Sequence, residues 1–210
     1  MSKQVYAVVP AAGMSTRMGS PKQLLPFGDK TILQTVVDTL LEAELDGVMV
    51  VLGHYAEAVR ESLGERPVDF HVNSNYRNGM FSSILCGICA LPGSANAALI
   101  ALGDQPRIAG EVVRRVVAAY REGEKGIVIP TVEGERGHPA LVDLQKYGAE
   151  IAGLSGEAGL KPVMRGHPGD TLELPVDDVR ILRDIDTPED YRAELERQET
   201  EGRRQKSFHR

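Results

Sequence analysis

Short apolar runs that alternate with amphipathic segments constrain the fold of this chain more than any other feature. Four runs are nearly continuous in apolar residues and have the length of single strands: 4–10, 47–53, 97–102 and 126–130. Segments with the helical spacing of apolar residues follow three of them, at 31–41, 56–63 and 111–120. Strands that are buried on both faces read as continuous apolar runs, and their crossover helices cover the sheet. The pattern therefore predicts an α/β fold with a mostly parallel sheet between two layers of helices.

After Pro130 this alternation loosens. A turn at 133–137 separates the run 126–130 from a second one at 139–142, which predicts a small antiparallel excursion. The remaining expected elements are strands at 68–72 and 179–183, one or two short helices in 153–167, and a closing helix at 188–199. We expect one domain over 1–199, because 210 residues can bury a substantial core, and a disordered polar tail over 200–210.

Charge and targeting signals narrow the class of partner. The net charge of -6 argues against a general nucleic-acid binder, which needs a basic face. The N-terminal residues have no secretory pattern, and no apolar run is long enough to span a bilayer. We therefore expect a cytoplasmic protein that binds neither nucleic acid nor membrane.

The two cysteines, Cys86 and Cys89, have the C-x-x-C spacing of a redox pair or of half a zinc site. A zinc site needs a second pair of ligands, and the five histidines offer no pair at ligand spacing. A redox pair usually opens a helix, whereas these residues follow an apolar segment that predicts the interior of one. We expect both thiols to pack in the core.

The connection over 10–31 is far longer than the roughly two to six residues that are usual in α/β units. It contains Gly13 and Gly19, which let backbone amides approach a ligand, two hydroxyls, and the cations Arg17 and Lys22. A merely flexible surface loop is the alternative. The spacing fits neither a P-loop nor a dinucleotide fingerprint. We interpret the connection as a polyphosphate-binding loop of another geometry.

Two carboxylates follow expected strands, and ligands of open α/β sheets bind beyond the carboxyl ends of strands. Asp104 lies in a Gly-Asp-Gln-Pro segment, where it either binds a ligand or closes a turn. Thr187 and Asp190 have the spacing of a helix cap, which leaves Asp186 outside the cap and free to face Asp104. Two carboxylates opposite a cationic loop predict a Mg²⁺ site.

Five short motifs follow one another along the chain. They are Ala11-Ala12-Gly13-x-Ser15-x-Arg17-Met18-Gly19-x-x-Lys22, Asn78-Gly79-Met80-x-Ser82-Ser83, Gly103-Asp104-Gln105-Pro106, Gly137-His138-Pro139 and Asp186-Thr187-Pro188-Glu189-Asp190. In this order and spacing they resemble the MobA/MocA-type nucleotidyltransferases, and most closely the molybdenum cofactor cytidylyltransferases. The resemblance implies a Rossmann-like three-layer sandwich. It also implies a Mg²⁺-dependent reaction in which an acceptor phosphate attacks the α-phosphate of a nucleoside triphosphate and releases pyrophosphate.

The resemblance also implies roles for individual residues. Nucleotide binding falls to the loop and to a serine pair: Ala11, Ala12, Gly13, Ser15, Arg17, Lys22, Ser82 and Ser83. Catalysis falls to Arg17, Lys22 and Asp104, metal binding to Asp104 and Asp186, and acceptor binding to His138 and Lys161. Such chemistry needs positioning and charge neutralisation more than a covalent nucleophile.

Two positions bear on the substrates. Ala12 stands where the guanylyl branch of the family tends to have glycine, which favours CTP over GTP. Lys161 stands where the cofactor subgroup tends to have arginine, so a point charge replaces a planar fork in the acceptor site. We expect CTP, or another nucleoside triphosphate, and a molybdopterin-type acceptor, with a molybdoenzyme as a further partner. The alternatives are a sugar or alcohol phosphate as acceptor, or a non-catalytic molybdopterin-binding chaperone.

Overall fold

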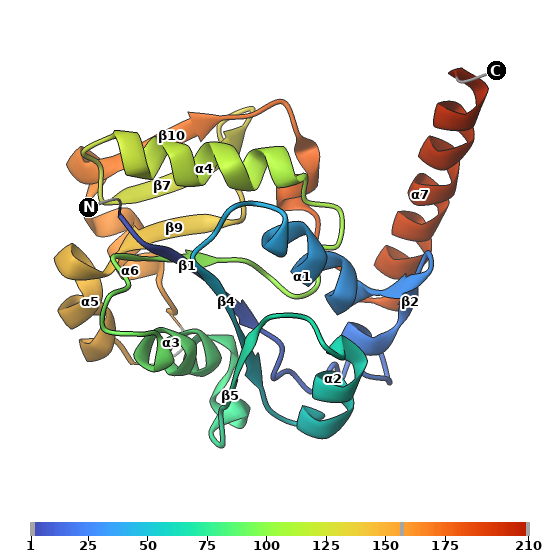
Figure 1. Ribbon diagram of the computed structural model, residues 1–210, viewed down its shortest axis with the longest axis horizontal. Coiled ribbons are helices and arrows are strands. Elements are labelled where there is room, and N and C mark those ends of the chain that lie inside the picture. Colours follow the sequence, from blue (N-terminus) through green and yellow to red (C-terminus); the bar gives the residue numbers. More distant parts are fainter. Residues whose placement is uncertain (1–2, 156–157, 209–210) are drawn as a thin grey trace.

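The computed structural model describes residues 3–155 and 158–208 and shows a central sheet between two layers of helices (Figure 1). The strands of this sheet are β1 (Val5–Pro10), β4 (Gly47–Leu52), β5 (Asp69–Val72), β6 (Ala97–Ile100), β7 (Ile127–Val132), β8 (Glu135–Arg136), β9 (Ala140–Asp143) and β10 (Thr171–Pro175). Their order is β10-β7-β9-β6-β1-β4-β5, with β8 paired to β7. A separate hairpin consists of β2 (Pro26–Phe27) and β3 (Lys30–Thr31).

The pairing agrees with the predicted fold class. β1 is parallel to both β4 and β6, β4 is parallel to β5, and β7 is parallel to β10. β9 runs antiparallel between β6 and β7, and β8 is antiparallel to β7. The antiparallel excursion predicted after Pro130 is therefore confirmed.

Seven α-helices occur in the described residues: α1 (Ile32–Leu41), α2 (Ala56–Leu63), α3 (Met80–Ala90), α4 (Gly110–Glu122), α5 (Leu144–Gly153), α6 (Lys161–Gly166) and α7 (Pro188–Phe208). Alternate residues of β1 divide the core. Ala7 and Val9 pack with α1, α2 and α4, whereas Val8 packs with α3, α5 and α6. Both faces of the sheet are thus buried, as its continuous apolar strands require.

Several expected elements differ in the structure. Residues 179–183 were expected as a strand, but Val179–Leu182 is a 3₁₀ helix, because the Asp178 side chain accepts a hydrogen bond from the backbone amide of Arg180. β10 was not expected, and α5 begins before the helical region predicted at 153–167. The closing helix continues beyond 199 to Phe208 and projects from the body of the molecule (Figure 1), while residues 209–210 lie outside the described residues.

Both cysteines lie on α3, as expected, and both are free thiols. Cys86 is half-buried and packs against the core, whereas Cys89 is exposed. The expectation of core packing is therefore wrong for Cys89, which lies on the outer side of the helix. In the described part of the chain, no helix is long and apolar enough to cross a membrane.

Candidate active site

A cavity of about 440 Å³ opens at the carboxyl ends of the central strands. The long connection after β1 forms one side of it, the start of α3 forms another, and the segments that follow β6 and precede α7 close it. The predicted site residues that line this cavity are Ala12, Gly13, Ser15, Arg17, Lys22, Ser83, Asp104 and Asp186. Segments far apart in the sequence thus meet where ligands of open α/β sheets bind.

Lys22 joins the two carboxylates that the sequence predicts as metal ligands. Its Nζ lies 2.5 Å from Oδ2 of Asp104 and 2.8 Å from Oδ1 of Asp186. Arg17 Nη2 lies 2.8 Å from the other oxygen of Asp186. The side chains of Lys22 and Asp104 are only 15% and 17% exposed, so this ion pair is weakly screened by solvent. The structure therefore brings Arg17, Lys22, Asp104 and Asp186 into one cluster.

The surroundings set the ionisation of this cluster. Burial acts to lower the pKa of Lys22, but attraction to Asp104 and Asp186 outweighs it, so this pKa lies above its usual value. Burial raises the pKa of Asp104 despite the opposing charge of Lys22. For Asp186 burial acts in the same direction, yet Lys22 and Arg17 prevail and hold its pKa below the usual value. Removal of the Lys22 charge would thus make both carboxylates harder to ionise.

One carboxylate oxygen of Asp104 is available to bind a ligand. Its Oδ1 is buried and has no hydrogen-bond partner among the described residues, although buried polar atoms are normally paired. Within those same residues, no group of three or more His, Cys, Asp and Glu side chains is placed to hold a metal. Two carboxylates without further protein ligands suit Mg²⁺, which keeps several waters and takes substrate phosphates as ligands. Asp104 and Asp186 therefore fit the predicted divalent cation.

The connection after β1 is held in place at its start. The backbone amide of Ala11 donates to Val51 O at 2.9 Å, and that of His54 donates to Ala12 O at 3.3 Å. Ala12 lies directly against Gly53, where an added Cβ would be 2.6 Å from the Ala12 Cβ. Ala11 is buried beneath the cavity, so its side chain is a packing residue. The strand ends of β1 and β4 thus fix the first residues of the loop.

Ser15 closes the middle of this loop. Its Oγ accepts from the backbone amide of Lys22 at 3.2 Å and donates to Oε1 of the buried Gln23 at 3.3 Å. Its φ of 52° lies in the left-handed region, which is uncommon for a residue with a side chain. The hydroxyl of Ser15 therefore positions Lys22.

Ser82 and Ser83 share one partner that sequence analysis missed. The Asn73 side-chain amide donates to the hydroxyl of Ser82 at 2.9 Å and to that of Ser83 at 3.0 Å. The Ser82 hydroxyl also donates to the carbonyl oxygens of Asn75 and Gly79, which lie on either side of the turn that precedes α3, while Ser83 lines the cavity. The position of Asn73 just after a predicted strand was the signal that could have identified it.

A second cavity, of about 730 Å³, adjoins the first and shares Arg77, Gly79 and Met80 with it. Its lining includes His138 and Lys161, the predicted acceptor residues. Four cationic side chains line it together with apolar ones. The cationic residues are Arg77, Arg136, Lys161 and Arg165, and the apolar ones include Ile84, Ile100, Ile129 and Met164. The three arginines were not predicted. For two of them, Arg136 and Arg165, the Arg-Gly-His-Pro sequence that occurs at 136–139 and at 165–168 was an available signal.

His138 enters the second cavity from the segment between β8 and β9. Burial lowers the pKa of its imidazole below the usual value, and nearby Asp184 opposes this only in part. Its backbone amide donates to Ile181 O at 3.0 Å. Gly137 makes this approach possible, because a Cβ there would lie 2.6 Å from Ile181. His138 is thus held uncharged at neutral pH in a fixed place.

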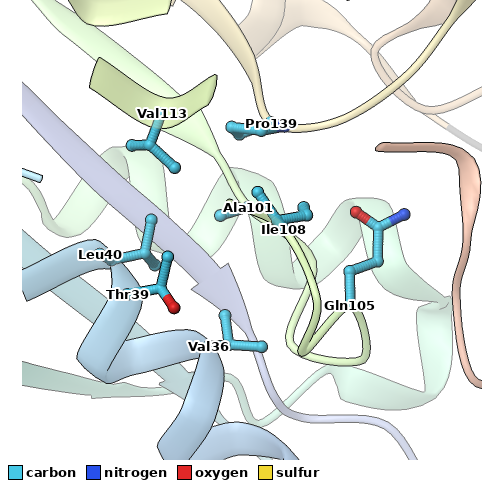
Figure 2. A pocket seen from close by; sticks show the side chains of 8 residues that line it. All are labelled: Val36, Thr39, Leu40, Ala101, Gln105, Ile108, Val113 and Pro139. Carbon is cyan, nitrogen blue, oxygen red and sulfur yellow. The ribbon is translucent and has the colours of Figure 1, made fainter. Parts of the chain in front are cut away.

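A third cavity, behind the loop that carries Asp104, has no room for a substrate. Figure 2 shows Gln105 near apolar side chains of α1 and α4 and near Ala101, which directly follows β6. Its volume of about 10 Å³ is close to the space for one water molecule. Gln105 is buried here, away from the two larger cavities, so this member of the Gly-Asp-Gln-Pro motif is a packing residue.

Comparisons with known proteins agree with this geometry. Residues 7–172 match the family model described as the MobA-like NTP transferase domain. The chain is 32% identical over 192 residues to nicotine blue oxidoreductase of Paenarthrobacter nicotinovorans, covering 88% of this chain and 93% of that protein. It is 25% identical to the molybdenum cofactor cytidylyltransferase of Escherichia coli (strain K12), covering 92% and 96%.

Solved structures include close likenesses of the fold. A crystal structure of Rv0371c from Mycobacterium tuberculosis H37Rv has a TM-score of 0.82 at 30% identity and covers 93% of this chain and 100% of its own. A complex of Rv0371c with manganese has a TM-score of 0.78 at 28% identity and the same coverage. The chain therefore belongs to the family of the MobA-like NTP transferase domain.

Proposed function

We propose that this nucleotidyltransferase transfers CMP from CTP to the phosphate of molybdopterin and releases pyrophosphate with Mg²⁺ as cofactor. The observation that carries the proposal is the cluster of Lys22, Arg17, Asp104 and Asp186 at a cavity that shares a wall with a second, partly cationic one. Two adjoining cavities suit a reaction that joins two substrates. The cytidylyltransferase of Escherichia coli supports the choice of nucleotide and acceptor, and the manganese complex of Rv0371c supports a divalent cation.

The first cavity provides the nucleotide half of the reaction. Lys22 and Arg17 bind the triphosphate and neutralise the charge that develops on it, which is where most of the rate of such transfers arises. Ala12, Gly13 and Ser83 enclose the nucleoside side of the cavity. Asp104 and Asp186 would hold the Mg²⁺, which when bound supplies positive charge to the phosphates. Ser15 keeps Lys22 aligned through its backbone amide.

The second cavity provides the acceptor half. Lys161 and the nearby arginines bind the acceptor phosphate, and the apolar side chains cover the flat body of the pterin. The uncharged imidazole of His138 offers a hydrogen bond without adding a further charge. Arg77 lies in the wall shared by the two cavities, where the acceptor phosphate approaches the nucleotide. Product then passes to a molybdoenzyme.

Pyrophosphate release tests the proposal. We expect release with Mg²⁺, CTP and molybdopterin, and much less with GTP or ATP. Asp104→Asn is expected to lower the rate by about 100-fold or more, because the bound metal contributes several kcal/mol and each 1.36 kcal/mol is tenfold. Asp69→Asn, at an exposed carboxylate on β5, serves as the control and is expected to keep the wild-type rate.

Two outcomes would contradict the assignment in different ways. Release with CTP and a sugar or alcohol phosphate, but none with molybdopterin, would move the acceptor to the alternative class. An absence of release with every nucleotide, or full activity in Asp104→Asn, would remove the catalytic role of the cluster. A molybdopterin-binding chaperone would then be the better description.

A reductase is the second candidate, because the identity to nicotine blue oxidoreductase, 32%, exceeds the 25% to the cytidylyltransferase. Oxidation of NADH or NADPH with a coloured, planar acceptor would show this activity. We expect no such oxidation. Oxidation of NADH or NADPH that persists in Asp104→Asn would favour the reductase.

A further inference from the structure

A buried ion pair joins the loop after β6 to helix α7. Arg107 lies in the same loop as Asp104, and Glu194 lies on α7, which begins just after Asp186. The side chains of Arg107 and Glu194 are only 7% and 5% exposed, and Arg107 Nε lies 3.5 Å from Glu194 Oε2. Arg107 Nη2 lies 2.5 Å from Oε1 of Glu201, about two turns further along the helix. One guanidinium thus spans two turns of α7.

The same loop and helix hold the two carboxylates of the candidate metal site. The backbone amide of Ile185 donates to Asp104 O at 3.0 Å. Oδ2 of Asp190, in the first turn of α7, accepts from the backbone amides of Asp186 at 3.3 Å and Thr187 at 2.8 Å. The backbone at Asp186 is therefore fixed to α7. Any shift of the loop against the helix changes the distance between Asp104 and Asp186.

The ion pair is a poor way to gain stability. Arg107 Nη1 and Glu194 Oε2 are buried and lack hydrogen-bond partners in the described part of the chain. Apolar side chains of similar size often stabilise a buried site as well as, or better than, an ion pair does. A directional contact between loop and helix, by contrast, fixes their relative position.

We propose that Arg107, through Glu194, sets the spacing of Asp104 and Asp186 and so the affinity of this site for a divalent cation. Arg107 is a positioning residue, since it contacts neither the cavity nor the two carboxylate groups in the described structure. The inference rests on the proposed metal-dependent transfer. Outer residues that orient metal ligands typically contribute about 10–100-fold to metal affinity.

Binding of Mn²⁺ to the full chain, followed by the paramagnetic signal of the free ion, tests the inference directly. We expect Arg107→Met to bind Mn²⁺ about 10–100-fold more weakly. Arg107→Lys keeps the charge but not the fork, and is expected to fall between this variant and the wild type. In pyrophosphate release, the variants should need more metal and yet approach the wild-type kcat when metal saturates. A merely structural defect would lower kcat at every metal concentration.

Arg197→Met is the matched control. Arg197 pairs with the other oxygen of Glu194, is 46% exposed and lies on α7 itself, so its pair does not bridge helix and loop. We expect its Mn²⁺ affinity to stay within about twofold of the wild type, because the lost contact joins two residues of the same helix and does not hold the loop against it. A folded Arg107→Met protein with wild-type Mn²⁺ affinity would overturn the inference.

Two further readouts keep the test decisive. If Arg107→Met does not fold, Arg107→Lys and Glu194→Gln replace it, and wild-type Mn²⁺ affinity in both would overturn the inference. If the wild type binds Mn²⁺ but releases no pyrophosphate with any nucleotide, the proposed function fails. The Mn²⁺ titrations of the variants still decide the positioning role in that case.

Discussion

The burial of His138 makes the stability of the fold depend on pH. Its burial lowers the pKa of the imidazole in the folded state, so the unfolded chain takes up a proton first as the pH falls. Proton uptake by the unfolded state favours unfolding. The part of the stability that depends on an uncharged His138 is therefore present above the unfolded pKa of about 6.5 and is lost at lower pH.

We predict that His138→Gln flattens the pH dependence of stability on the acid side. Glutamine keeps a polar side chain and cannot take up the proton. Urea denaturation at pH 5 and at pH 7.5 measures the effect, and the wild type should lose more stability between them than the variant. Between pH 7.5 and 9 the two curves should run parallel. If stability fell equally steeply on the acid side in the wild type and in His138→Gln, this would contradict the burial of His138.

At the level of single residues, the sequence is informative about position along the chain and less so about contacts. Asp104 and Asp186 could be paired in advance because each was expected to follow a strand. Asp104 does follow β6, whereas Asp186 follows the 3₁₀ helix at Val179–Leu182, so the two carboxylates meet although one premise of the prediction was wrong. The contact of Lys22 with both could not be predicted, because it spans 82 and 164 residues and depends on the path of a long loop. The exposure of Cys89 was missed for a related reason, since α3 is apolar on more than its buried side.

The first turn of the long loop depends on its neighbour, the turn after β4. Gly53 has no side chain where Ala12 crosses it, and an added Cβ would also lie 2.7 Å from the Ala12 carbonyl oxygen. Neither this backbone oxygen nor the Cβ of Ala12 can move aside as the end of a flexible side chain does. The two turns therefore form one unit at the carboxyl ends of β1 and β4.

We predict that Gly53→Ala displaces the loop and weakens nucleotide binding by at least about tenfold, since such overpacking costs roughly 1–3 kcal/mol. Gly148→Ala is the matched control, because this glycine lies within α5 and its Cβ would meet only Leu144 at 3.9 Å. That change is expected to leave nucleotide affinity unaltered and to stabilise the helix by about 1 kcal/mol. Calorimetric titration with the nucleotide checks both. Equal affinities in the two variants would show that the turns are independent.

The strands that could be predicted from the sequence are those that are buried on both faces. β1, β4, β6 and β7 are almost entirely apolar because helices cover both faces of the sheet. β10 lies at the edge of the sheet and is half-exposed, so its residues carry no continuous apolar signal. The 3₁₀ helix at Val179–Leu182 has strand-like residues, and the cap from Asp178 overrides their preference.

For the whole molecule, the cluster of Arg17, Lys22, Asp104 and Asp186 predicts that nucleotide and metal together stabilise the fold. A ligand at about 100 times its dissociation constant adds roughly 2.7 kcal/mol to the free energy of unfolding. We predict a clear rise in Tm with CTP and Mg²⁺, and a smaller one with CTP alone. Asp186→Asn should lose most of the difference between the two. A rise that is the same with and without Mg²⁺ would argue against a metal at Asp104 and Asp186.

The order of the strands is a property of the whole molecule that the sequence did not reveal. Apolar periodicity identifies a strand but not its neighbours, which depend on contacts between distant segments. β9 lies between β6 and β7 although it follows β7 in the chain. The resemblance to a known family predicted the general fold, whereas the lining of the second cavity became known only from the structure.

The central place of β1 has a consequence for how the protein is made. This strand pairs with β4 and, through Val5 and Ala97, with a segment that is synthesised much later. Contacts between distant segments form slowly, because a long loop must close first. The Asp186 side of the cluster is the last to emerge from the ribosome. A nascent chain therefore possesses its cationic loop long before the carboxylates that restrain it, and divalent-ion binding should be among the last properties to return on refolding.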